Sequence, residues 1–147
     1  MRRVVIALLI ASACAKPSAK PKSDLTIADS GRARAAVTVM SVALATKESG
    51  PKETVAAFGE VYEFSPATIE VHRDEPTAIT FWNLQADDDH DFLLMDDRNV
   101  VLTQFKLPPL KKTTRLFTFH RDGLYRFVCT MHKPEMSGVI VVVPPAL

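Results

Sequence analysis

From about residue 54 onward, apolar and polar residues alternate with period two, and this pattern limits the folds that the chain can adopt. Successive side chains of a β-strand point to opposite faces, so such alternation predicts half-buried strands. Pro, Gly and Asp clusters separate the runs. We therefore expect an all-β, antiparallel β-sandwich without a long helix. The candidate strands are 55–64, 68–72, 77–83, 91–95, 103–107, 113–119, 124–129 and 138–143, with a further edge strand at 37–46.

The N-terminus reads as an export signal. Two arginines are followed by a short apolar run and then by small residues, which predicts a secretory signal peptide over residues 1–13. Cleavage after an A-x-A sequence would suit this segment. The position of Cys14 also resembles a bacterial lipobox, in which this cysteine is lipidated, although Ala11 is smaller than that pattern favours. We expect a periplasmic or cell-envelope protein that meets the membrane only through this lipid anchor.

A segment rich in alanine, lysine and proline follows over residues 14–36 and predicts a flexible tether. The folded domain is then expected over residues 37–147, with its core at about 54–143. A net charge of +1 argues against nucleic-acid binding, which requires a strongly basic surface. Cys129 has no second cysteine in the domain to pair with, so it is a free thiol that burial or a metal must protect.

The strand that ends in Cys129 places Tyr125, Phe127 and Cys129 on one face. A turn at Asp122-Gly123 precedes it, and the order Asp-Gly-x-Tyr resembles the tyrosine corner of Greek-key sandwiches, in which the phenol bonds back to the backbone. Cys129 therefore leaves the core side of the sandwich at the start of a loop.

That loop carries three possible metal donors within eight residues: the thiolate sulfur of Cys129, an imidazole nitrogen of His132 and the thioether sulfur of Met136. A trigonal His2Cys set with a weak, distant Met is typical of blue-copper electron-transfer sites. His90 opens a strand after the loop 84–89 and is the candidate for the second histidine. Met131, His72, His120 and the acidic run 87–89 are expected at the surface or in packing, without a metal role.

These residues resemble the cupredoxin family, specifically single-domain blue-copper proteins with the short ligand loop of pseudoazurin and amicyanin. The domain is also similar to the copper domain of oxidase subunit II, but Lys133 stands where a binuclear centre needs a second cysteine. The matching pieces are Tyr62-x-Phe64-x-Pro66-x-x-Ile69-x-Val71, Ile79-x-Phe81-x-Asn83, His90-Asp91-Phe92 and Gly123-x-Tyr125-x-Phe127-x-Cys129-x-x-His132, with Met136 and Gly138.

The resemblance implies one copper ion, no enzymatic activity, a monomer, and one-electron exchange with a redox protein such as a cytochrome or an oxidase. It also implies that His132 is the more exposed ligand. The family commonly has Asn after the first histidine, whereas this chain has Asp91, which can accept but not donate hydrogen bonds. We expect Asp91 to accept from Thr130 and to support the ligand loop from outside the donor set.

Two alternatives use the same residues. A periplasmic copper delivery protein would hold Cu(I) for insertion into a cuproenzyme, although the histidine and methionine string of known chaperones is absent here. A degenerate cupredoxin used only for protein contacts would leave a complete ligand set idle.

Overall fold

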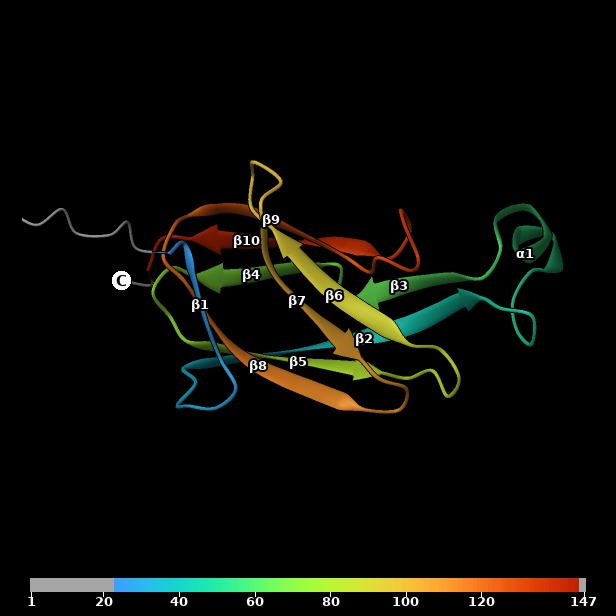
Figure 1. Cartoon of the computed structure of the whole chain (residues 1–147), viewed down its shortest axis with the longest axis horizontal. Helices are drawn as coiled ribbons and strands as arrows, with labels where there is room; N and C mark the ends of the chain where they lie inside the picture. The colour runs from blue at the N-terminus through green and yellow to red at the C-terminus, as the bar shows by residue number, and fades with distance from the viewer. Residues whose placement is uncertain (1–22, 146–147) are drawn as a thin grey trace, which may run out of the picture.

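The computed structural model describes residues 23–145 as two facing β-sheets, with a short helix extending from one end (Figure 1). Within this part of the chain, no helix is long and apolar enough to cross a membrane. The elements are β1 Leu25–Ala28, β2 Ala35–Ala45, α1 Lys52–Phe58, β3 Val61–Ser65, β4 Thr68–His72, β5 Thr77–Asn83, β6 His90–Met95, β7 Val101–Leu107, β8 Lys112–Phe119, β9 Gly123–Val128 and β10 Ser137–Val143.

Each sheet has five strands, in the orders β1-β8-β5-β2-β3 and β4-β10-β9-β6-β7. The predicted β-sandwich is confirmed, and most neighbouring strands are antiparallel. The pairs β2/β5 and β4/β10 are parallel, however, so both sheets are mixed rather than wholly antiparallel. Period-two alternation sets which face of a strand is buried, but it does not specify the direction of the neighbouring strand, which depends on the crossover connections.

The segment predicted as a tether is partly folded. Strand β1 pairs with β8, matching Leu25 to Phe119 and Ala28 to Leu116, and Leu25 is buried in the core. The tether prediction is therefore wrong for β1, a strand of four residues that is too short to show a periodic pattern. The predicted signal peptide, Cys14 and the first part of the tether lie outside the described residues.

The predicted strands at 37–46 and 55–64 differ from the structure. Strand β2 lies inside its sheet, between β5 and β3, instead of at an edge. Residues 52–58 form α1, with an acidic residue, Glu53, in its first turn, and the chain turns at Gly59, which has φ 80°. Two alanines inside this segment favour the helix over the strand. Only the last part of the predicted strand remains, as β3.

The interior between the sheets is dominated by aromatic side chains. Six phenylalanines and two tyrosines are almost completely buried. Tyr125 donates a hydrogen bond of 2.9 Å to the carbonyl oxygen of Arg121, which confirms the predicted tyrosine corner. This corner lies at the start of β9, and the other end of the same strand leads directly into Cys129. The packed sandwich thus fixes the base of the loop that carries the candidate donors.

Candidate metal centre

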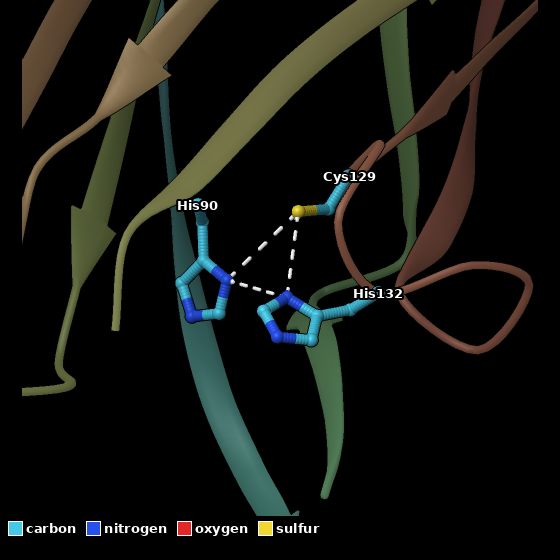
Figure 2. A group of neighbouring side chains, drawn as sticks. All are labelled: His90, Cys129 and His132. Carbon is cyan, nitrogen blue, oxygen red and sulfur yellow. Dashed lines mark hydrogen bonds between the residues drawn. The ribbon is translucent and has the colours of Figure 1, made fainter. Parts of the chain in front are cut away.

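Three predicted donors, His90, Cys129 and His132, come together at one end of the sandwich (Figure 2). The Nδ1 atoms of the two histidines are 3.1 Å apart. The Sγ atom of Cys129 lies 3.6 Å from Nδ1 of His132 and 3.9 Å from Nδ1 of His90. All three side chains point toward a common centre, although His90 belongs to a different strand from the loop that carries the other two.

The position of His90 is set by the chain on both sides of it. It is the first residue of β6, where it pairs with Leu107 of β7, and it is completely buried. The preceding loop is held by buried Asn83, whose Nδ2 donates to the carbonyl oxygens of Asp88 and Leu107 at 2.8 and 2.9 Å. Asn83 Oδ1 accepts from Ser41 Oγ and the backbone N–H of Gln85. This amide therefore joins the loop before His90 to both sheets.

The loop from Cys129 to Met136 is closed by its own backbone. The N–H of Cys129 donates to the carbonyl oxygen of Met136, and the N–H of Met136 donates to that of His132, both at 2.9 Å. Met136 is completely buried, whereas His132 is half-buried. The exposure of the two histidines follows the order that the family resemblance implies. The assignment of Met136 as the fourth ligand stays a prediction.

Asp91 supports this loop from β6. Its carboxylate accepts from the backbone N–H and the hydroxyl of Thr130, each at 2.6 Å, and from Gln104 Nε2 at 2.7 Å. Burial opposes ionisation, but these hydrogen bonds outweigh it and lower the pKa of Asp91. The carboxylate is therefore charged at neutral pH. The expected contact between Asp91 and Thr130 is present, and both Thr130 donors take part in it.

The pKa shifts of His90 and Cys129 suit metal binding. Burial, together with the neighbouring His132, lowers the pKa of His90 to about 4. Its imidazole is therefore neutral at pH 7 and can offer a lone pair. Burial raises the pKa of Cys129, so the metal-free thiol keeps its proton. A bound cation would displace that proton, because a thiolate is the ligand form.

The donor distances fit a single metal ion. First-row metals bind imidazole nitrogen at about 2.0–2.1 Å and thiolate sulfur at about 2.3 Å, so neighbouring ligands are separated by roughly 3.3–3.9 Å in trigonal or tetrahedral sites. The three observed separations, 3.1, 3.6 and 3.9 Å, lie close to this range. One thiolate with two imidazoles is a donor set that copper prefers.

A family model described as a cupredoxin-like domain matches residues 3–142. The chain belongs to the cupredoxin-like family. Family membership and the donor cluster together identify copper as the cofactor of this cupredoxin-like chain. No curated protein sequence matches it.

Solved structures support the cupredoxin-like fold. Auracyanin B shares 14% identity over 78% of this chain and 93% of its own, with a TM-score of 0.57. Auracyanin A, a "blue" copper protein from Chloroflexus aurantiacus, shares 15% identity over 74% of this chain and 98% of its own, with a TM-score of 0.53. A reduced amicyanin mutant shares 19% identity, covers 82% and 100% of the two chains and has a TM-score of 0.51.

The remaining histidines of the described region have other partners. His72 Nδ1 lies 2.8 Å from the carbonyl oxygen of Pro144. His120 lies between Asp74 and Thr26, at 2.7 and 2.9 Å. Neither belongs to the donor cluster. Met131 is 52% exposed, which places it on the surface of the ligand loop.

The sequence did not reveal two residues beside the donors of this cupredoxin-like domain. Tyr62 packs its ring against both histidines, and its hydroxyl donates a hydrogen bond to Asp88. The acidic run 87–89 was expected to lie in a solvated loop; Asp87 and Asp89 are exposed, whereas Asp88 is half-buried. The available signal was the place of Tyr62 on the core face of its strand, two residues before buried Phe64.

Proposed function

We propose that this chain is an exported, mononuclear blue-copper protein that carries single electrons, with His90, Cys129, His132 and Met136 as the copper ligands. The observation that carries the proposal is the convergence of one Sγ and two Nδ1 atoms within 4.8 Å of one another. The cupredoxin-like fold and its blue-copper neighbours support a copper-binding electron carrier in general.

Copper bound here would supply a one-electron couple between Cu(I) and Cu(II). The chain's part is to hold the donors still, so that neither oxidation state requires a large rearrangement. Packing and backbone bonds do this: His90 is fixed by β6 and Asn83, and Cys129 and His132 are fixed by the closed loop. A rigid donor set keeps the structural cost of each electron transfer small.

Electrons would enter and leave through His132. Its ring is half-buried, and exposed Met131 and Pro134 lie beside it in the same loop. We propose that a redox protein, such as a cytochrome or an oxidase, docks weakly against this apolar rim, since electron-transfer encounters are typically small and transient. With four protein ligands on the ion, no position is left for a substrate, and the proposed role is therefore not catalytic.

Export is proposed from the sequence alone. The charged, apolar and small-residue regions of residues 1–13 support a signal peptide, and Cys14 supports lipid attachment at the cell envelope. An oxidising compartment would suit a domain whose buried thiol is protected by copper. Mass spectrometry of the mature protein from a membrane fraction would test this. A diacylglyceryl group on Cys14 supports the anchor, and a mature chain that begins elsewhere contradicts it.

Reconstitution of residues 23–147 with Cu(II) tests the copper site. We expect an intense visible thiolate-to-copper band and a narrow EPR hyperfine splitting, both lost in Cys129→Ser. His72→Ala is the matched control, because the His72 ring lies outside the donor cluster, with Nδ1 2.8 Å from the carbonyl oxygen of Pro144, and its removal should leave both signals unchanged. A wild-type protein without the band, or a Cys129→Ser variant that keeps it, would overturn the proposal.

Redox cycling separates an electron carrier from a copper delivery protein. A carrier should bleach on reduction and regain its band on reoxidation, while the ion stays bound to the protein. A delivery protein would hold Cu(I) preferentially and lose it to an acceptor with competing thiolate ligands. Retention of copper through repeated cycles in the presence of such an acceptor supports electron transfer.

A further inference from the structure

Tyr62 lies beside the donors but comes from the opposite sheet. It belongs to β3, whereas His90 belongs to β6 of the other sheet and His132 to the loop after β9. Its ring centroid is 5.0 Å from that of His90 and 4.6 Å from that of His132. The side chain is 1% exposed. One aromatic ring therefore packs against both imidazoles at once.

The hydroxyl group of Tyr62 is also held in place. It donates a hydrogen bond to the carboxylate of Asp88. Asp88 is held in turn by its backbone, because its carbonyl oxygen accepts from Asn83 Nδ2 at 2.8 Å. Asn83 is completely buried. The phenol thus connects the histidine rings to an anchored position in the acidic loop 84–89.

The phenol is the donor in this pair, and the carboxylate of Asp88 is the acceptor. A bond of this kind, from a neutral donor to a carboxylate, is stronger than one between two neutral groups.

His132 is the donor that most needs this support. It stands on a loop and is half-buried. Its ring packs against the rings of Tyr62 and His90, and its Nδ1 atom lies 3.1 Å from His90 Nδ1 and 3.6 Å from Cys129 Sγ. These two Nδ1 contacts must break when a metal ion enters between the three donor atoms. The packing against Tyr62 does not involve those atoms, so a bound metal would leave it in place.

We propose that Tyr62, anchored by Asp88, is a positioning residue that holds the imidazoles of His132 and His90 in ligand orientation both before and after copper binds. The proposal rests on the copper site assigned above. Through the hydrogen bond from Tyr62 to Asp88, the acidic loop 84–89 would help to position the ligands, in addition to any effect of its negative charge. Cu(II) favours tetragonal geometry, so loosening the rings should let the oxidised site relax away from the trigonal arrangement.

Four substitutions test the contributions of the hydrogen bond and of the negative charge separately. Tyr62→Phe keeps the ring and removes its anchor, whereas Asp88→Ala removes the acceptor. Asp88→Asn keeps an acceptor oxygen but removes the charge. Asp87→Ala is the matched control for charge, because exposed Asp87 carries the same charge one residue away and has no bond to Tyr62.

The first readout uses the metal-free protein, so it does not depend on copper at all. NMR of the His132 imidazole should show a single ordered ring in wild type, Asp87→Ala and Asp88→Asn. We expect signals broadened by exchange in Tyr62→Phe and Asp88→Ala. Sharp, unshifted His132 signals in both of those variants would overturn the proposal, whether or not the wild-type chain proves to bind copper.

The second readout uses the copper-loaded protein. Tyr62→Phe and Asp88→Ala should widen the Cu(II) EPR hyperfine splitting and lower the rate of electron self-exchange by about tenfold, equivalent to roughly 1.4 kcal/mol of barrier. The double variant should change no more than the single variants, since both break the same bond. Additive changes, or a wild-type spectrum in Tyr62→Phe, would show that the ring only fills space.

Loss of stability alone could imitate these effects, so a second buried phenol serves as control. Tyr125→Phe removes a hydrogen bond of the same kind at the tyrosine corner, remote from the donors. It should lower the urea concentration at the midpoint of unfolding and leave the EPR spectrum and the His132 signals unchanged. Tyr125→Phe effects on either signal that equal those of Tyr62→Phe would contradict a positioning role.

Discussion

The carboxylate of Asp91 receives both hydrogen-bond donors of Thr130, its backbone N–H and its hydroxyl, each at 2.6 Å. Asp91 directly follows the candidate ligand His90, and Thr130 directly follows Cys129. The pair thus joins the strand that carries one donor to the loop that carries the others. It also places a negative charge near the sulfur of Cys129, which becomes a thiolate ligand when a metal ion binds.

Asp91→Asn should raise the reduction potential while copper stays bound. A nearby negative charge favours Cu(II) over Cu(I), and its removal favours the reduced state. A unit charge several ångströms away in a partly screened site is worth about 1–3 kcal/mol, so we expect a shift on the order of 50–100 mV. Cyclic voltammetry measures it. Exposed Asp89→Asn is the control, and an equal shift there would mean that the contact with Thr130 is irrelevant.

Met136→Leu should retain copper and also raise the potential, because a weak axial donor that partly stabilises Cu(II) is removed. The substitution nearly conserves volume at a completely buried position, so it should cost less than about 1.5 kcal/mol of stability. Voltammetry and urea unfolding check the two effects. An unchanged potential would place Met136 in the packing of the loop rather than in the coordination shell.

The metal-free domain should lose stability as the pH falls from about 6.5 to about 4. His90 has a pKa of about 4 when folded, while an unfolded histidine titrates near 6.5, so the unfolded chain binds the proton first in this interval. The loss should be about 3 kcal/mol and complete below pH 4. Urea unfolding at several pH values measures it. Asp91 affects stability at lower pH. Because its pKa is lowered in the folded domain, its contribution to the free energy of unfolding is lost only in stronger acid.

His90→Gln is the matched variant for this pH dependence. It removes the titrating group but keeps a polar side chain of moderate size. The slope of stability against pH between 4 and 6.5 should flatten in this variant. A slope as steep as in wild type would assign the dependence to another group.

Gly138→Ala should destabilise the domain by about 1–3 kcal/mol. A Cβ at this position would overlap the carbonyl oxygen of Ala67 and the ring of Phe127. Neither can move freely, because Ala67 accepts a 2.8 Å hydrogen bond from the N–H of Val139 and Phe127 is completely buried. Thermal unfolding compares this variant with Ser137→Ala next to it. Equal melting temperatures for the two would contradict the close approach.

Much of the site could be predicted because its donors are close in sequence or mark a strand boundary. Cys129 and His132 share one loop, and His90 opens an apolar strand after a polar loop. Both inferences needed only local order along the chain. The contact between Asp91 and Thr130 was expected from the resemblance to the cupredoxin family, in which an Asn commonly follows the first histidine.

The role of Tyr62 could not be predicted in the same way. Its partner is one of three consecutive aspartates, and nothing in the sequence distinguishes Asp88 from Asp87 or Asp89 before the loop geometry is known. Strand β1 was hidden for a different reason, since four residues carry too little periodicity, and its pairing with β8 spans about ninety residues. The parallel pairs likewise depend on long-range topology.

Strand β1 also determines at which end of the sandwich the described chain begins. Its register matches Leu25 to Phe119, the last residue of β8, while the first residues of β8 lie near the loop that precedes the donors. The described chain therefore begins at the end of the sandwich opposite α1 (Figure 1). A domain held through the residues before Ser23 would present its donor end outward, to partners diffusing past, and turn its tyrosine corner toward the point of attachment.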